Sequence, residues 1–210
     1  MNKLLTSDIV KMIQYMTKLI IEKEAYFCEL DSAAGDGDFG TSLAKGFNHL
    51  KEMWDNLPQD DIGTFLRSCG IIITEYCGGA SGPIWGSAFR SAGKYAAKKT
   101  ELSLIELGEL MLNTVNGIQK RGGAQLGDKT LLDALIPVTE SLKKSGEAGE
   151  DLLEAMRKAA KEAALGAEKT KDIIASRGRA SYVGERSLNH PDAGAMAVGI
   201  LFTEIVEIFK

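Results

Sequence analysis

The sequence has no long hydrophobic run and no signal peptide, and these absences exclude two classes of protein. Its most apolar stretch, residues 193–202, is too short to cross a bilayer, and Glu204 and Glu207 interrupt its continuation. Residues 1–16 mix charged and apolar side chains and show no cleavable signal pattern. We therefore expect neither a membrane protein nor a secreted one.

Cysteine and clustered positive charge are also scarce. Cys28, Cys69 and Cys77 form no Cys-x-x-Cys pair, and their odd number and irregular spacing predict reduced thiols in a cytoplasmic protein. The net charge is -4, and lysine and arginine are scattered rather than arranged in a basic stripe with aromatics, so no nucleic-acid surface is expected. The 210 residues can bury a substantial core, and no repeat or linker divides them, so we expect a single domain over 1–210.

What the chain does contain is helical periodicity. Apolar residues between Ile9 and Ile21 recur at spacings of three and four, as one face of a helix requires. Similar patterns predict eight helices, at about 6–29, 41–56, 60–77, 83–99, 103–121, 129–145, 150–175 and 192–209. Asp60, Ser103 and Asp192 are expected N-caps, and Pro83 suits a first helical turn. We predict an all-α, antiparallel, up-and-down bundle or barrel.

The junctions between the predicted helices are of two kinds. The first, third, fifth and seventh are rich in glycine, whereas the second, fourth and sixth are ordinary polar turns. The glycine-rich junctions are residues 35–40, 78–82, 122–128 and 177–194. Because alternate junctions of an up-and-down bundle lie at the same end, all four should meet on one rim. Glycines that served only to stop helices would not follow this alternation.

Three aspartates, Asp31, Asp36 and Asp38, are expected on this rim. Two carboxylates about 4 Å apart repel by about 4 kcal/mol at an effective dielectric near 20, so a protein that gathers them protonates one or binds a cation. Hard oxygen ligands at a glycine turn suit Mg²⁺ or Ca²⁺. Helix N-termini on the same rim would attract phosphate. The combination predicts a Mg-nucleotide site at one end of the bundle; the alternative is that the aspartates only cap helices and form turns.

The seventh junction is long enough to be a lid, and it carries Arg177, Arg179 and Arg186. An arginine placed over a transferring phosphoryl group stabilises its spread negative charge, and the alternative is a solvated basic loop. Tyr182 is expected to pack into the core rather than cover an adenine. For His190, an ordinary loop histidine is favoured over a phosphate carrier or general base.

One segment resembles a known phosphate-binding motif but does not match it. Residues 122–130 resemble a phosphate-binding P-loop, but Asp128 stands between Gly127 and Lys129, and no strand precedes them.

Five short motifs occur in a fixed order along the chain. They are Gly35-Asp36-Gly37-Asp38, Gly78-Gly79-Ala80-Ser81-Gly82-Pro83, Gly127-Asp128-Lys129-Thr130, Gly178-Arg179-Ala180-Ser181-Tyr182 and Gly184-Glu185-Arg186-Ser187. Together they resemble the nucleotide-binding L subunit of bacterial dihydroxyacetone kinase, over nearly the whole chain. The resemblance implies an eight-helix antiparallel barrel with ADP or ATP bound at one end.

The resemblance also implies the site residues. Asp31, Asp36 and Asp38 would bind two Mg²⁺ ions that bridge the nucleotide phosphates, and Arg179 would be catalytic. The implied nucleotide contacts are Phe39, Gly40, Thr41, Ser42, Ala80, Ser81, Gly122, Leu131, Arg179, Asp192, Ala193 and Gly194. Bacterial L subunits often carry histidine where Phe39 stands, so this contact would be apolar here.

The partners follow from the resemblance as well. A separate K subunit would hold dihydroxyacetone, and a phosphocarrier M subunit would recharge bound ADP with phosphate that comes ultimately from phosphoenolpyruvate. The stand-alone length favours this arrangement over an ATP-dependent kinase with fused domains. A homodimer and contact with a transcriptional regulator are further expectations. The alternatives are a kinase subunit for another ketose such as erythrulose or for carrier-bound fatty acids, and a nucleotide-binding regulatory module.

Overall fold

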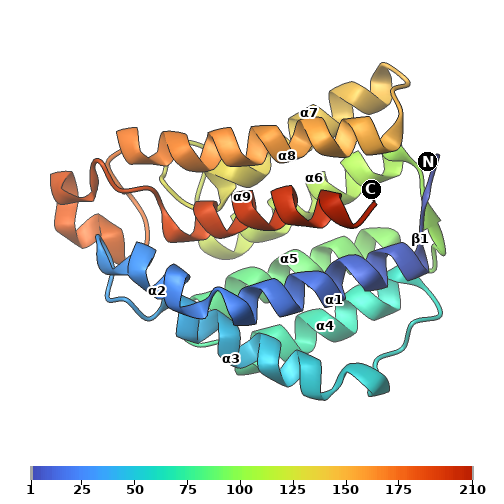
Figure 1. The fold of residues 1–210 in the computed structure, drawn as a ribbon, viewed down its shortest axis with the longest axis horizontal. Coiled ribbons are helices and arrows are strands. Elements are labelled where there is room, and N and C mark those ends of the chain that lie inside the picture. Colours follow the sequence, from blue (N-terminus) through green and yellow to red (C-terminus); the bar gives the residue numbers. More distant parts are fainter. Residues whose placement is uncertain (1, 210) are drawn as a thin grey trace.

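The computed structural model describes residues 2–209 as long helices that lie side by side along one axis (Figure 1). The α-helices are α1 (Thr6–Glu22), α2 (Glu24–Ser32), α3 (Phe39–Glu52), α4 (Ile62–Tyr76), α5 (Ser81–Ala96), α6 (Leu104–Gly122), α7 (Leu132–Glu147), α8 (Leu152–Lys169) and α9 (Ala193–Val206). Four 3-10 helices are η1 (Trp54–Asn56), η2 (Thr170–Asp172), η3 (Arg179–Ser187) and η4 (Glu207–Phe209). The strands β1 (Leu4–Leu5) and β2 (Glu101–Leu102) form one short antiparallel pair. The all-α prediction is confirmed.

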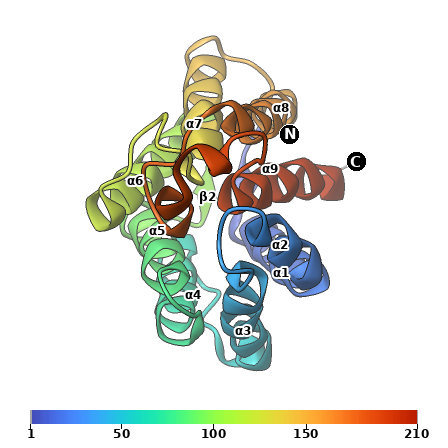
Figure 2. The same ribbon diagram turned by 90° about the vertical axis from the view of Figure 1, so that its left-hand side faces the viewer.

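The helices form a closed ring. From α3 to α9, each helix packs against the next one along the chain, and α1 contacts both α3 and α9, which closes the ring (Figure 2). Successive helices of this ring run in opposite directions, so their junctions alternate between the two ends (Figure 1). The predicted antiparallel barrel is therefore confirmed.

Several predicted helix boundaries are wrong: α3 ends at Glu52 rather than 56 and α8 at Lys169 rather than 175, and three further differences have a physical cause in the structure. The first helix does not run unbroken over 6–29, because Lys23 leaves helical geometry (φ -99, ψ 12) and separates α1 from α2. This break lets α2 turn its one buried side chain, Phe27, toward Phe39 at the start of α3. Asp61 rather than Asp60 caps α4, because its Oδ1 accepts the Thr64 amide at 2.6 Å. The helix expected at 129 begins only at Leu132, since Lys129 has a positive φ of 61°.

The other two expected caps are confirmed. Ser103 caps α6 in a reciprocal box with Glu106, and Asp192 caps α9 by accepting the Ala195 amide at 2.8 Å. Pro83 lies in the first turn of α5.

Apolar faces of the helices fill the ring. On α8 the inward face carries buried alanines at every fourth position, which lets α7 and α9 pack closely on both sides; they are Ala155, Ala159, Ala163 and Ala167. A cavity of about 170 Å³ remains in the interior. Its lining is apolar apart from Thr114, whose hydroxyl already donates to the Leu110 carbonyl, so it offers nothing to a phosphate.

Between residues 2 and 209, no helix is both long and apolar enough to cross a bilayer. Cys28, Cys69 and Cys77 are free thiols.

Candidate functional site

The four glycine-rich junctions meet at one end of the barrel, the left-hand end in Figure 1. Residues of the first, second and fourth of these glycine-rich junctions line a cleft of about 210 Å³ that is open to solvent, together with Lys129, Thr130 and Leu131, which directly follow the third. Residues of the cleft come from the end of α2, the starts of α3, α5 and α9, and the segments before α3, α5, α7 and α9. They are Asp31, Asp36, Asp38, Phe39, Ser42, Gly78, Gly79, Ala80, Ser81, Ile84, Trp85, Lys129, Thr130, Leu131, Arg177, Gly178, Arg179, Ala180, Asp192, Ala193 and Gly194. The predicted convergence of these junctions on one rim is confirmed.

An acidic turn between α2 and α3 forms one wall of the cleft. One oxygen from each of Asp31, Asp36 and Asp38 lies within 4.8 Å of the others. Asp31 builds the turn, because its Oδ2 accepts the Gly37 amide at 2.8 Å and the Asp38 amide at 3.2 Å. Gly37 has a φ of 75°, which a side chain would strain, so glycine is needed for the chain to fold back here. The turn therefore holds three acidic side chains together near the surface.

Arg179 faces these carboxylates from the opposite wall. Its guanidinium pairs with Asp36, and Nη1 lies 3.4 Å from Oδ2 of Asp38. About half of the Arg179 side chain is exposed, so this pair is screened by solvent. One arginine leaves two of the three negative charges unbalanced among the groups at this turn, which favours a further cation.

Helix starts at the two ends of the barrel differ in part in how their amides are satisfied. At the end opposite the cleft, Asp61, Ser103 and Asp151 cap α4, α6 and α8 with their own side chains. At the cleft, Asp192 caps α9, but Asp38 and Ala80 form no side-chain cap at the starts of α3 and α5. In α3 the Thr41 amide donates to Cys28 Sγ at 3.3 Å. Uncapped first-turn amides carry the positive end of the helix dipole and suit a phosphate. The cleft is thus anionic at the turn and anion-binding at the helix starts.

Asp192 lies at the inner edge of the cleft, at the start of α9. Burial first, and then the neighbouring Asp133 and Asp31, raise the pKa of Asp192, the Ala195 amide and Lys129 oppose the shift, and the net value is about 6. Near neutral pH, a larger share of this carboxyl is protonated than of an exposed aspartate.

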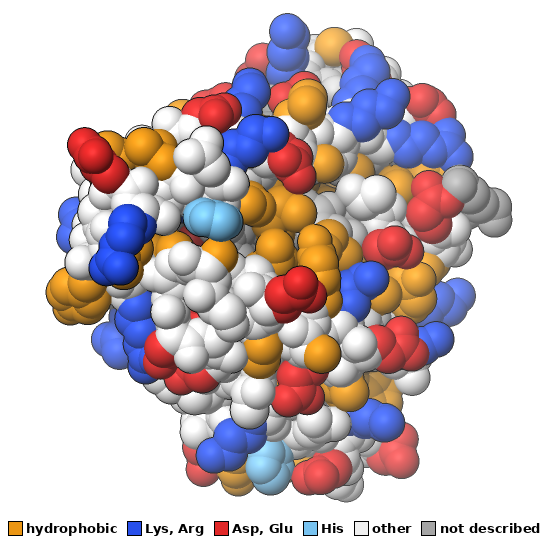
Figure 3. All heavy atoms as spheres, turned by 60° about the vertical axis from the view of Figure 1, so that its left-hand side comes forward, with side chains coloured by type: hydrophobic (Ala, Val, Ile, Leu, Met, Phe, Trp, Pro, Cys, Tyr) orange, Lys and Arg blue, Asp and Glu red, His pale blue; other side chains and the backbone are white. Residues whose placement is uncertain are grey.

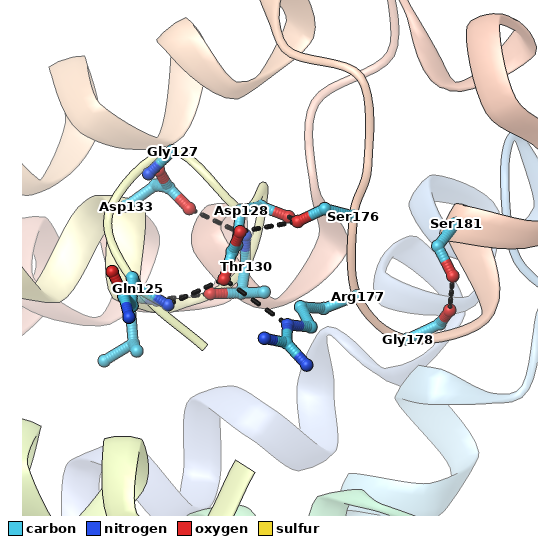
Figure 4. Close-up of polar contacts among 10 residues, drawn as sticks. Gln125, Gly127, Asp128, Thr130, Asp133, Ser176, Arg177, Gly178 and Ser181 are labelled. Carbon is cyan, nitrogen blue, oxygen red and sulfur yellow. Dashed lines mark hydrogen bonds and ion pairs between the residues drawn. The ribbon is translucent and has the colours of Figure 1, made fainter. Parts of the chain in front are cut away.

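The segment before α7 contacts the segment before α9 through Asp128 (Figure 4). Its carboxylate accepts the Ser176 hydroxyl at 2.6 Å and the Gln125 amide at 2.8 Å, and it lies 3.4 Å from Nε of Arg177. These three donors, Ser176 first, hold the pKa of Asp128 below its usual value. Asp128 therefore stays ionised and joins two walls of the cleft.

Most of the predicted nucleotide contacts line this cleft, and three do not. Among residues 2–209, Gly40, Thr41 and Gly122 are absent from its lining. Gly40 is buried where α3 crosses α2, since a Cβ there would lie 2.0 Å from the Glu24 carbonyl. The Thr41 hydroxyl turns to Glu24 and lies 3.5 Å from Cys28 Sγ.

The sequence patterns did not predict the structural roles of Asp133 and Lys129. Asp133 is almost fully buried, and its two oxygens accept the amides of Gly127 (2.6 Å) and Thr130 (2.7 Å), which shapes the segment before α7. A polar residue on an otherwise apolar stretch of helix, Leu131 to Leu135, was the signal that could have identified Asp133.

The expectation that Tyr182 packs into the core is wrong. Its side chain is 87% exposed, because η3 lies outside the helical ring and buries only Ser187. The long junction also has secondary structure of its own, with a kink at Gly184 (φ 56°) inside η3.

Charge around the cleft end is mixed. Figure 3 shows acidic and basic side chains interspersed over the face that includes this end, with hydrophobic side chains exposed between them. This view shows no continuous basic stripe of the kind that tracks a nucleic-acid backbone.

Known proteins match this chain in sequence and in fold. The DAK2 domain matches residues 33–207. The chain is 37% identical over 200 residues to "PEP-dependent dihydroxyacetone kinase 2, ADP-binding subunit DhaL" of Listeria innocua, covering 94% of this chain and 92% of the relative. It is 34% identical over 192 residues to the PEP-dependent dihydroxyacetone kinase ADP-binding subunit DhaL of Escherichia coli, covering 91% of each.

A solved structure shares the fold. The dihydroxyacetone kinase from C. freundii, in complex with AMP-PNP and Mg²⁺, superposes with a TM-score of 0.73 at 24% identity. The superposition covers 95% of this chain and 33% of that one.

Proposed function

The chain belongs to the DAK2 domain family, which it shares with the ADP-binding subunits of dihydroxyacetone kinases, and we propose that it is the nucleotide-binding subunit of such a kinase. In this proposal residues 1–210 act as one domain that holds ADP with Mg²⁺. A separate K subunit presents dihydroxyacetone, and a phosphocarrier M subunit recharges the bound ADP with phosphate that comes ultimately from phosphoenolpyruvate. The two named relatives are ADP-binding subunits of PEP-dependent kinases, and each is matched over at least nine-tenths of its length, which supports this arrangement.

The observation that carries the proposal is that one cleft combines a group that binds cations with groups that bind anions. The acidic turn attracts a divalent cation, and the uncapped starts of α3 and α5 attract a phosphate. A Mg-polyphosphate satisfies both at once, because the metal lies between carboxylate and phosphate oxygens. A phosphate alone would be repelled by the aspartates.

The residues at the turn fit magnesium. Asp31, Asp36 and Asp38 offer only carboxylate oxygens, within 4.8 Å of one another, and no nitrogen or sulfur ligand belongs to this cluster of described residues. We propose that they hold two Mg²⁺ ions, which when bound neutralise the phosphate oxygens. One oxygen of Asp31 is already engaged by two amides, so its other oxygen faces the metal in this proposal.

The rest of the cleft divides into polar and apolar parts. We propose that the hydroxyls of Ser42 and Ser81 and the amide of Ala80, at the starts of α3 and α5, bind the phosphates. Asp192, Ala193 and Gly194 line the cleft at the start of α9. The apolar side chains that could cover the nucleoside are Phe39, Ile84, Trp85 and Leu131. Gly40, Thr41 and Gly122 are proposed to act by shaping these walls.

Arg179 is the proposed catalytic residue. During transfer a substrate hydroxyl oxygen forms a bond to the terminal phosphorus of ATP, the recharged form of the bound ADP, while the bond from that phosphorus to the bridging oxygen breaks. The hydroxyl proton is released to a base or to solvent, and ADP is the leaving group that stays bound for the next recharging. Negative charge spreads over the moving phosphoryl oxygens. The Arg179 guanidinium pairs with Asp36 and Asp38. When the nucleotide binds, it can exchange these carboxylates for the phosphate oxygens beside them.

The content of the purified protein tests the proposal. The protein is denatured, and released nucleotide is identified by chromatography. Stoichiometric ADP that exchanges slowly supports the phosphocarrier-fed subunit. An empty site that fills rapidly with ATP favours an ATP-dependent kinase subunit, and ADP binding without transfer by any K and M pair favours a regulatory module. A protein that binds neither ADP nor ATP with Mg²⁺ contradicts the proposal.

A further inference from the structure

Lys129 is a charged side chain buried without any directly bonded carboxylate. Only 2% of the residue is exposed. Among the described residues, Nζ donates solely to backbone carbonyls, those of Thr170, Ser187 and His190 at 2.7 Å each and that of Ile173 at 3.1 Å. An ammonium has three N–H donors, so these four acceptors use all of them. Such a group is fully committed to holding backbone in place.

The four carbonyls belong to both ends of one segment. Thr170 and Ile173 precede residues 174–186, which we call the arginine loop, and Ser187 and His190 follow it. Lys129 itself belongs to a different junction, the one before α7. It therefore ties the two ends of the arginine loop to each other and to the neighbouring wall of the cleft.

The backbone of Lys129 is held in an uncommon conformation for this purpose. Its φ is 61°, in the left-handed region, which L-residues other than glycine rarely adopt. Strain of this kind persists only where the surroundings enforce it, and it is concentrated at functional sites. Asp128, the residue before it, adds contacts to Ser176 and Arg177 on the same side (Figure 4).

The surroundings of Lys129 act on its charge in opposite directions. Burial lowers the pKa of Lys129 below its ordinary value, and the nearby carboxylates of Asp192, Asp172 and Asp133 offset only part of this shift. A neutral amine would have one donor fewer for the same four carbonyls. An apolar side chain could fill the same space at less desolvation cost, so packing alone does not account for a lysine here.

Beyond its base, the arginine loop reaches across the cleft through Arg179. That guanidinium pairs with Asp36 and Asp38 in the acidic turn. Hydrogen bonds within the loop connect residues on either side of Arg179. For example, the Ser181 hydroxyl donates to the Gly178 carbonyl at 2.7 Å. The position of Arg179 consequently depends on how the base is held.

We propose that Lys129 is a positioning residue for phosphoryl transfer: by clamping both ends of the arginine loop, its ammonium sets where Arg179 stands over the acidic turn. This inference rests on the proposed function, in which Arg179 stabilises the transferring phosphoryl group.

The test is a double-mutant cycle in the assembled system with K subunit, M subunit, phosphoenolpyruvate and dihydroxyacetone. Lys129→Met should slow transfer by about 100-fold while ADP retention changes by less than about fivefold, as loss of transition-state contacts predicts. Because Lys129 acts through Arg179, the Lys129→Met/Arg179→Ala double variant should be no slower than Arg179→Ala alone. If the double variant is slower than Arg179→Ala by the full factor that Lys129→Met causes alone, the proposal is overturned. Lys143→Met, which removes an exposed ion pair with Glu109, is the matched control and should transfer at the wild-type rate.

Hydrogen exchange provides a second readout that a general loss of stability would not reproduce. In Lys129→Met, amides of residues 174–186 should exchange at least about tenfold faster, with helices α3 to α6 unchanged. If Lys129→Met does not fold, Lys129→Gln, which keeps two N–H donors, should show the same pattern with a smaller slowing. Unchanged exchange in the loop would overturn the proposal for Lys129 alone, whereas an Arg179→Ala variant that transfers at the wild-type rate would overturn the proposed function.

Discussion

Asp38 and Arg179 are 141 positions apart in the chain, yet Oδ2 of the first lies 3.4 Å from Nη1 of the second. The contact exists because the junction before α3 and the junction before α9 lie at the same end of an antiparallel ring. It places a half-exposed positive charge beside the acidic turn. We infer that binding of a Mg-nucleotide exchanges this ion pair for metal–carboxylate and arginine–phosphate contacts.

Replacing Arg179 should separate transfer from binding. We expect Arg179→Ala to slow phosphoryl transfer by about 10³-fold or more, because one guanidinium over a transferring phosphoryl group contributes about that much. Retention of ADP should change by less than about tenfold, since the acidic turn and the helix starts remain. Single-turnover kinetics measure the rate of transfer, and equilibrium binding measures the retention of ADP. Arg157→Ala, which removes an exposed arginine on α8, is the control, and equal losses in both arginine variants would contradict the assignment.

Asp31 should reveal two roles when it is replaced in two ways. Asp31→Ala removes the acceptor of the Gly37 and Asp38 amides, and we expect it to cost about 2 kcal/mol, because hydrogen bonds to a charged group contribute about 1.5–3 kcal/mol. Asp31→Asn keeps an acceptor oxygen and should melt close to the wild type, but it removes the charge and should weaken Mg²⁺ binding at least about tenfold. Thermal melts and Mg²⁺ titrations distinguish the two effects. An Asp31→Asn variant that binds Mg²⁺·ADP normally would remove Asp31 from the metal site.

Gly46 should tolerate no side chain. A Cβ at this position of α3 would lie 2.2 Å from Sγ and 2.8 Å from the amide nitrogen of Cys77. Overpacking of this kind costs about 1–3 kcal/mol, so Gly46→Ala should lower Tm by several degrees. Adding Cys77→Ala removes the closer clash and should restore part of the loss. A Gly46→Ala protein that melts with the wild type would contradict the close approach of α3 to the end of α4.

Acid stability should depend on Glu106. The Lys99 ammonium and the amide of Ser103 hold the pKa of Glu106 at about 2, below its ordinary value of 4.5. A carboxylate with a lowered folded-state pKa stabilises the protein above the unfolded-state pKa, and that contribution is lost as the pH falls through the folded-state pKa. The wild type should therefore exceed Glu106→Gln in the free energy of unfolding above about pH 5, with the difference shrinking between about pH 4.5 and 2. Urea unfolding at several pH values measures this, and a difference that stays constant down to pH 2 would contradict it.

Much of the fold followed from short-range sequence signals. The spacing of apolar residues predicted the helices, and the alternation of glycine-rich and polar junctions predicted which ends would meet. Ser103 and Asp192 were identified as caps because capping depends on a residue and the amides two or three positions later. Asp60 was preferred to Asp61 because adjacent aspartates give the same local signal, and only the structure shows which one accepts the Thr64 amide.

The errors and omissions lie where distant residues decide. The break at Lys23 has no proline or glycine to mark it, and it arises where α2 turns Phe27 toward α3. Tyr182 was expected in the core because a tyrosine is usually more buried, but among the described residues of η3 only Ser187 is buried. Lys129 was placed at the start of a helix, since nothing nearby in the sequence shows that carbonyls 41 to 61 positions later would surround its ammonium.

The most direct test of the account is the binding of Mg²⁺·ADP to the Asp36→Asn/Asp38→Asn protein, measured by isothermal titration calorimetry beside the wild type. The matched control is Asp55→Asn/Asp60→Asn, which removes two exposed aspartates from outside the cleft lining. We predict that the first pair weakens binding by at least about 100-fold, since loss of two negative charges at the metal removes several kcal/mol of its binding free energy, while the control pair binds as the wild type does. Equal affinity in all three proteins would contradict the claim that the acidic turn holds the metal of the nucleotide.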